Sequence, residues 1–192
     1  QDDFSKTISL LDLGTGTGCI PIAILKHAPH VQATAVDIAE GALQTARQNA
    51  RAHDVDDRMR FVVSNWYESL GPTCSSPLPR PFRGVSHPFD IITANPPYIP
   101  RADIETLDPA VRFHDPIRAL DGGATGLDPY EILIAGLDTH LAPHGIALFE
   151  IGIGQAPDIQ RIVEKYGLDA HPPIVDDGGI PRVICVTRPT KK

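Results

Sequence analysis

The chain has 192 residues, a formal net charge of −7 and a pI near 5.5. This length suits one domain over residues 1–192, and the acidic balance argues against a broad phosphate-binding face, so nucleic acid is not the expected partner. No run reaches the roughly 18 apolar residues of a membrane-spanning helix, so no membrane partner is expected. The three cysteines form no C-x-x-C pair, which indicates free thiols in a reducing compartment.

Apolar strand-like runs alternate with helical stretches along most of the chain. We expect strands at 8–13, 32–36, 59–63, 89–94, 145–151, 168–171 and 182–187, and helices at 19–27, 39–52, 128–141 and 156–166. Such alternation predicts an α/β fold with a parallel sheet. Residues 71–88 are dense in Pro and Ser and are expected to form a surface insertion, and 99–123 form a long connection of the kind that makes lids or binding loops.

A glycine-rich turn follows the first strand and consists of Gly14, Thr15, Gly16, Thr17 and Gly18. Glycines at a strand-to-helix turn let a ligand lie against bare backbone, at the carboxyl edge where open α/β sheets bind. Cys19 stands where a dinucleotide fingerprint has its third glycine, so a nicotinamide dehydrogenase fits poorly. A tight turn without a ligand is the alternative. Asp12, just before the turn, either meets a ligand ammonium or accepts hydrogen bonds from loop amides.

Polar or aromatic residues also end the second and third strands. Asp37 can accept both hydroxyls of a ribose, although capping the helix that begins near Ala39 is a competing role. Asn65 and Trp66 can hold and flank a planar base such as adenine, while a core position is the alternative for Trp66.

The fourth strand stops at Asn95, because Pro96 and Pro97 have no N–H and restrict the backbone. The result is a stiff corner ending in Tyr98. The side-chain oxygen of Asn95 and the carbonyl of Pro96 are two acceptors that suit the two N–H bonds of an amide or exocyclic amine, and the Tyr98 ring can wall its plane. A plain strand-terminating turn is the alternative.

No metal site is predicted. His140 and His144 have the spacing of zinc ligands on a helix, but Pro143 separates them and no third ligand is close in the sequence. No nucleophile motif for hydrolysis is present.

In this order the four strand ends resemble those of a class I S-adenosylmethionine-dependent methyltransferase, and more narrowly of the release factor glutamine methyltransferases. The resemblance rests on residues 12–18 (DLGTGTG), 95–100 (NPPYIP), 119–127 (ALDGGATGL) and Arg182-Val183. Asn-Pro-Pro-Tyr is shared with DNA adenine methyltransferases, whereas Ala-Leu-Asp-Gly-Gly is more selective.

The resemblance implies a Rossmann-like class I methyltransferase fold with a mostly parallel seven-stranded sheet flanked by helices. It implies S-adenosyl-L-methionine as cofactor and, as substrate, the amide nitrogen of the glutamine in the Gly-Gly-Gln motif of a peptide-chain release factor. The implied catalytic residues are Asn95, Pro96, Pro97 and Tyr98. The implied cofactor-binding residues are Asp12, Gly14, Thr15, Gly16, Thr17, Gly18, Asp37, Asn65, Trp66 and Asn95.

The alternatives are a DNA or RNA adenine N6-methyltransferase, a non-catalytic S-adenosylmethionine-binding subunit, and an oxidoreductase. Two departures from the family stand out: Asn65 replaces a common Asp, and nothing corresponds to the family's N-terminal helical domain, which helps to dock the release factor. A monomer is expected. The Pro-rich insertion and the sequence GCIP at 18–21 resemble those of a mitochondrial member of the family. The resemblance therefore implies a mitochondrial location, and the bacterial cytoplasm is the alternative.

Overall fold

The computed structural model describes residues 7–70, 88–114 and 116–189, so the expected insertion at 71–88 lies outside the described residues except for Pro88. The chain divides into two compact units. The first unit comprises the residues up to Ala94 together with Asp138–Ala147, and the second comprises Asn95–Leu137 and the residues from Leu148 onward.

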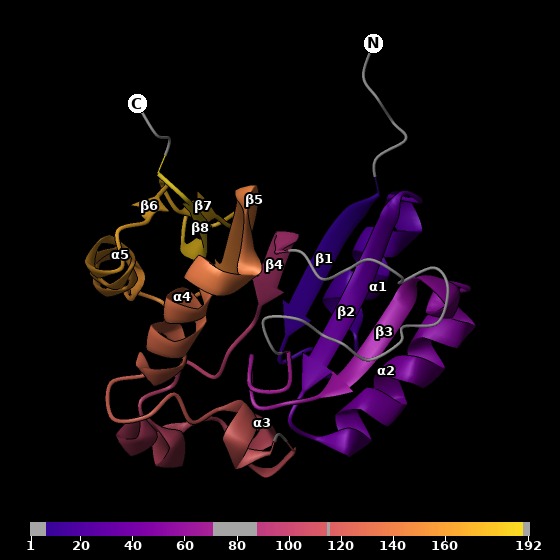
Figure 1. The fold of residues 1–192 in the computed structure, drawn as a ribbon. Coiled ribbons are helices and arrows are strands. Elements are labelled where there is room, and N and C mark those ends of the chain that lie inside the picture. The colour runs from indigo at the N-terminus through magenta and orange to yellow at the C-terminus, as the bar shows by residue number, and fades with distance from the viewer. Residues whose placement is uncertain (1–6, 71–87, 115, 190–192) are drawn as a thin grey trace. The chain divides into compact units, whose positions relative to one another are not determined.

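The first unit contains a parallel sheet, and helices α1 and α2 connect its successive strands along the chain (Figure 1). Its elements in chain order are β1 Ile8–Leu13, α1 Cys19–His27, β2 Val31–Asp37, α2 Glu40–Ala52, the 3-10 turn η1 Asp56–Arg58, β3 Met59–Val63 and β4 Phe89–Ala94. The strand order is β3-β2-β1-β4, and each of these pairings is parallel. The carboxyl ends of the four strands therefore meet at one edge, as the sequence predicts.

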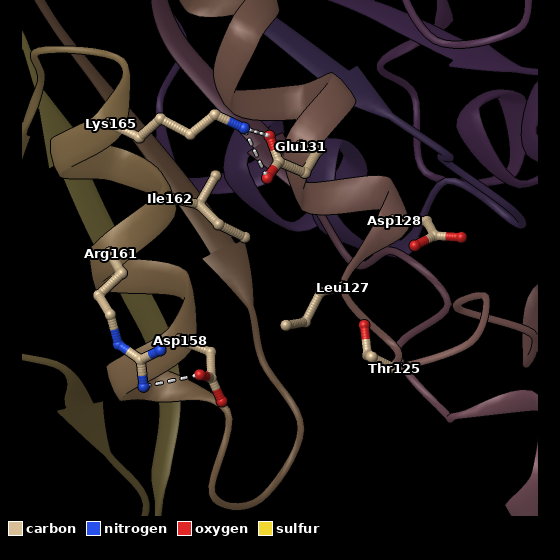
Figure 2. Close-up of a pocket in the computed structure, with 8 residues that line it drawn as sticks. All are labelled: Thr125, Leu127, Asp128, Glu131, Asp158, Arg161, Ile162 and Lys165. Atoms are coloured by element: carbon tan, nitrogen blue, oxygen red, sulfur yellow. Dashed lines mark hydrogen bonds and ion pairs between the residues drawn. The ribbon is translucent and has the colours of Figure 1, made fainter.

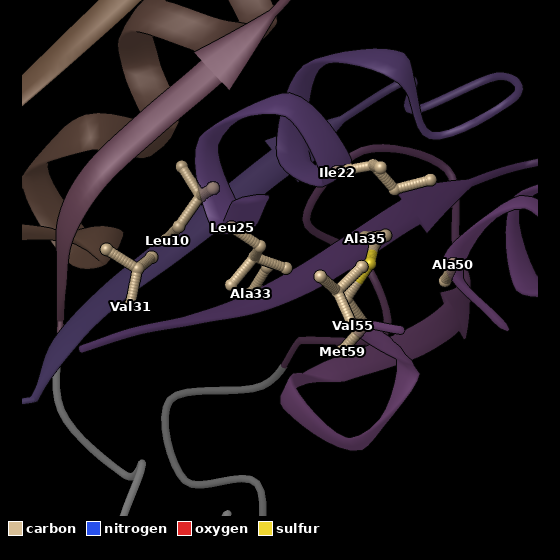
Figure 3. Packing of buried hydrophobic residues seen from close by; sticks show 9 residues of the cluster. All are labelled: Leu10, Ile22, Leu25, Val31, Ala33, Ala35, Ala50, Val55 and Met59. Carbon is tan, nitrogen blue, oxygen red and sulfur yellow. The ribbon is translucent and has the colours of Figure 1, made fainter. Parts of the chain in front are cut away.

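The core of the first unit lies between one face of this sheet and helices α1 and α2. Alternate residues of β2 point to the same face, and Val31, Ala33 and Ala35 are all nearly inaccessible. They pack with Leu10 of β1 and Leu25 of α1 in the cluster of Figure 3. Intervening residues such as Leu11, Leu13 and Val36 are also buried. Burial on both faces explains why apolar residues occupy both faces of these strands.

The second unit is less regular. Its elements are the 3-10 turn η2 Arg101–Thr106, α3 Pro109–His114, the 3-10 turn η3 Ile117–Ala119, most of α4 Asp128–His140, the end of β5 Leu141–Glu150, α5 Ala156–Lys165, β6 Asp169–Ala170, β7 Ile174–Val175 and β8 Pro181–Thr187. The last residues of α4 and the first residues of β5 belong to the first unit. Both β6 and β7 pair antiparallel with β8.

The expected elements are present, with three differences. The described residues form eight strands instead of seven, because Ile174–Val175 pairs with β8 as a short extra strand. Strand β5 begins at Leu141, four residues before the expected start, since Pro143 is exposed and tolerated near the strand's beginning. The connection at 99–123 is not structureless but contains α3 and two 3-10 turns. The α/β class is confirmed.

No helix in the described part of the chain is both long and apolar enough to span a bilayer.

Candidate active site

The glycine turn between β1 and α1 adopts a backbone that favours glycine. Gly14, Gly16 and Gly18 have φ angles of 69°, 55° and 81°, in the left-handed region that other residues avoid. A Cβ added to Gly16 would meet nothing within 4 Å. The turn thus leaves open space above Gly16, which suits the close approach of a ligand to the backbone.

Helix α2 and the end of β2 hold this turn in place. Asp37 Oδ2 accepts a hydrogen bond of 2.9 Å from Gly16 N, and Asn49 Nδ2 donates one of 2.9 Å to Thr17 O. A Cβ on Gly18 would lie 3.2 Å from the Cβ of Ala46, so the turn packs closely against α2. The turn is therefore fixed before any ligand binds.

Asp37 accepts hydrogen bonds from two backbone N–H groups through its two carboxylate oxygens. Its Oδ1 accepts a hydrogen bond of 2.8 Å from Ala39 N, the residue before α2, and its Oδ2 accepts the bond from Gly16 N. Each carboxylate oxygen has two acceptor sites, so both oxygens retain capacity for a ligand hydroxyl. The contact with Ala39 is a turn immediately before α2 and does not cap the N–H groups of its first turn, and binding of a ribose stays a prediction.

Asp12 is buried beneath the glycine turn, with 1% of its surface exposed. Its Oδ1 accepts a hydrogen bond of 2.6 Å from the Thr93 hydroxyl of β4. Its Oδ2 and the nearby Thr15 Oγ1 are buried and have no hydrogen-bond partner among the described residues. The Thr15 hydroxyl is close enough to lower the pKa of Asp12 but makes no well-formed hydrogen bond to it, so Asp12 Oδ2 is the buried acceptor that lacks a donor.

The pKa of Asp12 reflects this environment. Burial is the main cause that raises it, from 3.8 to about 6, while the hydroxyls of Thr15 and Thr93 act in the opposite direction and the charge of Asp37 adds to the rise. A cation placed against Oδ2 would favour the ionised form. Acceptance of hydrogen bonds from loop amides, the other role considered for Asp12, is not found among the described residues.

Trp66 lies against the glycine turn. A Cβ on Gly14 would lie 3.4 Å from the Trp66 ring, which is only partly buried. Trp66 has a positive φ of 50°, which is strained for a large side chain and is typical of functional positions. Asn65 is exposed, and its Nδ2 donates a hydrogen bond of 2.7 Å to Glu68 Oε1. Glu68 thus brings a carboxylate to this strand end.

The corner at Asn95 continues directly from β4. Ala94, the last residue of β4, pairs with Leu13, the residue before Gly14. Asn95 is exposed, Pro96 is buried, and Pro97 and Tyr98 are partly buried. The strand register therefore pairs the last residue of β4 with the residue that precedes the glycine turn.

Within the second unit, the segment at 120–126 supports the corner. Ile99 N donates to Leu120 O at 3.1 Å, and Gly122 N donates to Ile99 O at 2.9 Å. A Cβ on Gly122 would lie 2.9 Å from Pro97 O, and a Cβ on Gly126 would overlap Tyr98 O. These glycines are required because the corner's backbone occupies the space of a side chain. Packing against the corner thus explains why the Ala-Leu-Asp-Gly-Gly segment contains glycine at position 122.

The Tyr98 ring is fixed from a third segment. Its hydroxyl lies 3.4 Å from Glu150 Oε1, and the Tyr130 hydroxyl donates a bond of 2.7 Å to Glu150 O. Burial, followed by the negative charge of Glu150, raises the pKa of Tyr98, so its phenol stays protonated. Tyr98 is therefore a neutral ring at the corner.

A separate pocket of about 330 Å³ lies between the start of α4 and helix α5 (Figure 2). Its lining residues are Thr125, Leu127, Asp128, Glu131, Asp158, Arg161, Ile162 and Lys165. Lys165 Nζ bonds both carboxylate oxygens of Glu131 at 3.0 and 2.9 Å, and Arg161 pairs with Asp158 at 2.8 Å. Four of the five charged side chains are thus paired with one another. None of the predicted site residues lines this pocket.

Sequence reasoning missed Gln155, which bonds Tyr98 O, and Thr93, which bonds Asp12. Gln155 follows the end of β5 and a glycine-containing turn, so the rule that flagged the other strand ends would have flagged it too. Among the described residues, no group of three or more His, Cys, Asp or Glu is placed to hold a metal ion.

Known proteins similar to this chain include methyltransferases. Residues 2–75 match the family model described as "Methyltransferase small domain". The release factor glutamine methyltransferase of Rhodospirillum rubrum is 46% identical over 159 residues, which cover 83% of this chain and 44% of that protein. The enzyme of the same name from Agrobacterium fabrum is 39% identical over 179 residues, covering 93% and 57%. The chain therefore spans about half the length of the curated relatives it matches.

Solved structures show the same architecture. A methyltransferase from Pyrococcus furiosus aligns with a TM-score of 0.64 at 18% identity, over 94% of this chain and 75% of that one. The ribosomal protein L11 methylase of Lactobacillus delbrueckii subsp. bulgaricus aligns with a TM-score of 0.61 at 20% identity, over 95% and 71%. The fold is that of the class I S-adenosylmethionine-dependent methyltransferases. Within that class, the chain is homologous over most of its length to the release factor glutamine methyltransferases.

Proposed function

We propose that residues 1–192 form the catalytic domain of an S-adenosylmethionine-dependent protein methyltransferase. Its substrate is the side-chain amide nitrogen of the glutamine in the Gly-Gly-Gln motif of a peptide-chain release factor. The observation that carries this proposal is the 46% identity, over 83% of the chain, to a relative named release factor glutamine methyltransferase. The fold and the unpaired buried oxygens near the glycine turn support it independently.

The cofactor-binding residues in this proposal belong mainly to the first unit. Asp12 Oδ2 and Thr15 Oγ1 have no hydrogen-bond partner among the described residues. The ammonium group of the cofactor can donate N–H bonds to these oxygens, and its positive charge stabilises the Asp12 carboxylate. Asp37 holds the ribose, and the backbone of residues 14–18 lies under the ligand. Asn65 and Trp66 flank the adenine. S-adenosylmethionine supplies a methyl group that is already activated on a sulfonium.

The corner orients the acceptor. An amide nitrogen is a poor nucleophile because its lone pair is delocalised into the carbonyl, so orientation and polarisation must supply the catalysis. Asn95 Oδ1 and the Pro96 carbonyl accept the two amide N–H bonds and let electron density build on the nitrogen. Pro97 restricts the corner's backbone, and the Tyr98 ring limits the amide plane. Proton loss can follow methyl transfer, so no strong base is required.

A methylation assay tests this function. Full-length protein and labelled S-adenosylmethionine are offered a release factor, the same factor with its motif glutamine changed to alanine, and double-stranded DNA. We expect label in the unaltered factor alone. Label in the alanine variant would place the methyl elsewhere on the factor, and label in DNA would indicate an adenine methyltransferase.

Two further outcomes separate the remaining alternatives. Tight cofactor binding without transfer to any acceptor would indicate a non-catalytic subunit. A larger thermal stabilisation by a nicotinamide cofactor than by S-adenosylmethionine would indicate an oxidoreductase.

The compartment and the assembly state are part of the proposal. The relatives from Rhodospirillum and Agrobacterium are bacterial proteins, which favours the bacterial cytoplasm over the mitochondrial location that the Pro-rich segment suggests. Fractionation of the source cells distinguishes the two. Light scattering of the purified protein tests the expected monomer.

A further inference from the structure

Gln155 joins three separate segments of the second unit through its side-chain amide. Its Nε2 donates a hydrogen bond of 2.9 Å to Tyr98 O and one of 3.3 Å to Gly126 O. Its Oε1 accepts a bond of 2.9 Å from Gly152 N. Both donors and the acceptor of one carboxamide are therefore engaged, and the donor and acceptor types of the three backbone partners fix which way the amide faces.

The peptide group between Tyr98 and Ile99 is held at both ends by these contacts. Gln155 binds its carbonyl, while Leu120 O accepts a bond of 3.1 Å from its N–H. A peptide group with both polar atoms bonded to other segments cannot rotate without breaking one of them. Pro96 and Pro97 restrict the backbone just before it. Rotation of the whole corner is therefore limited at its far end by Gln155.

The surroundings leave Gln155 little freedom to do anything else. A Cβ on Gly126 would lie 2.7 Å from Gln155 Nε2, and a Cβ on Gly152 would lie 2.7 Å from its Oε1. The Cβ added to Gly152 would also lie 3.1 Å from the Tyr98 ring. The glycines thus make room for the amide and the ring together.

We propose that Gln155 is a positioning residue for methyl transfer, which sets the direction of the Asn95-Pro96-Pro97-Tyr98 corner by clamping the Tyr98 carbonyl. This inference rests on the proposed function. Gln155 acts through Tyr98 and touches neither the acceptor amide nor the methyl donor in this role. Displacements of about 1 Å far from the reacting atoms can lower rates by about 10²-fold.

The test compares Gln155→Glu with Gln160→Glu in the full-length protein. The first change keeps length and shape but places a carboxylate against two carbonyl oxygens, whereas Gln160 lies within helix α5, which begins just after Gln155, and is also partly buried. We expect kcat on the release factor to fall about 10²-fold for Gln155→Glu alone, with little change in the Kd for S-adenosylmethionine. If Gln155→Glu does not fold, Gln155→Met tests the loss of the donors without a new charge.

A pH profile separates positioning from general damage. As the pH falls toward the pKa of the introduced carboxyl, protonation returns one donor to it, so the ratio of the kcat of Gln155→Glu to that of the wild type should rise. A difference that is constant with pH would contradict the proposal, as would equal losses in Gln155→Glu and Gln160→Glu, or wild-type kcat in Gln155→Glu.

A second readout does not depend on activity. In protein labelled with fluorotyrosine, the Tyr98 resonance, assigned by its loss in Tyr98→Phe, should shift or broaden in Gln155→Glu while that of Tyr67 stays unchanged. If the wild type transfers no methyl group, the proposed function fails, and the resonance still decides whether Gln155 holds the corner. An unchanged Tyr98 resonance overturns the clamp itself.

Discussion

The glycine turn of the first unit and the proline corner of the second use hydrogen bonds in opposite ways. At the turn, Asp12 Oδ2 and Thr15 Oγ1 are buried without partners in the described part of the chain, and the space above Gly16 is open. At the corner, Gln155 engages its whole carboxamide on backbone groups, and Gly126 has no room for a Cβ.

This difference separates binding from positioning. Unpaired buried oxygens are unfavourable until a ligand pairs them, so they raise the affinity of a ligand that supplies the matching donors. A corner whose Tyr98–Ile99 peptide is bonded on both sides loses little freedom when a ligand is aligned on it. We therefore expect changes at the turn to act on cofactor affinity and changes at the corner to act on kcat or on stability.

The largest effect is expected for Asn95→Ala. Loss of one preorganised polar contact should lower kcat by about 10²–10³-fold. The fold should persist because Asn95 is exposed. Single-turnover methylation measures the rate, and the thermal midpoint controls for folding. Turnover equal to that of the wild type would remove Asn95 from the mechanism.

The second prediction compares two glycines with positive φ. Gly126→Ala should lower the free energy of unfolding by more than about 3 kcal/mol, because its Cβ would overlap Tyr98 O in addition to straining the backbone. Gly16→Ala should lose only the backbone cost of about 1–2 kcal/mol, because nothing lies within 4 Å of its Cβ. Urea unfolding measures both. Equal losses would show that the corner is no more tightly packed than the turn.

The third prediction concerns the buried carboxyl of Asp12, whose pKa rises from 3.8 to about 6 on folding. Between these values the folded state holds the proton more tightly, so stability falls as the pH rises through this window. The loss amounts to at most about 3 kcal/mol and is complete above pH 6 or so.

Asp12→Asn removes the group that titrates. The variant without ligand should be more stable than the wild type at pH 8 and closer to it at pH 4, as measured by urea unfolding at both values. Asp57→Asn, at an exposed position, controls for the loss of one negative charge. A variant that is less stable than the wild type at pH 8 would mean that Asp12 is paired without the cofactor.

The smallest effect is expected at Trp66, the only tryptophan of the chain. Trp66→Phe keeps a ring but reduces its area, so the affinity for S-adenosylmethionine should fall by a factor of about 5, or roughly 1 kcal/mol. Calorimetry measures this change. In the wild type, the fluorescence emission of Trp66 should shift when the cofactor binds. If saturating cofactor leaves this emission unchanged, the adenine does not bind beside Trp66.

Local patterns predicted the first unit well. The strand, glycine turn and helix from Ile8 to His27 are defined by residues close in sequence, and both faces of the sheet are buried, so their apolar runs are clear. The short turns within 99–123 were missed because η2, α3 and η3 are too brief to show a helical period.

The corner shows where such reasoning stops. Asn-Pro-Pro-Tyr identifies the turn, but the contact between Gln155 and Tyr98 joins residues 57 positions apart, and no periodic pattern connects them. The same holds for Thr93 and Asp12, which are 81 positions apart. Contacts of this kind depend on the order of the strands in the sheet, which local sequence patterns do not predict.

The unpaired oxygen of Asp12 has a calorimetric consequence. Near pH 6 about half of the ligand-free molecules carry a proton on this carboxyl, since its pKa is about 6. A cationic ligand that settles against the oxygen must expel that proton into the buffer. The heat of binding at pH 6 would then depend on the ionisation enthalpy of the chosen buffer.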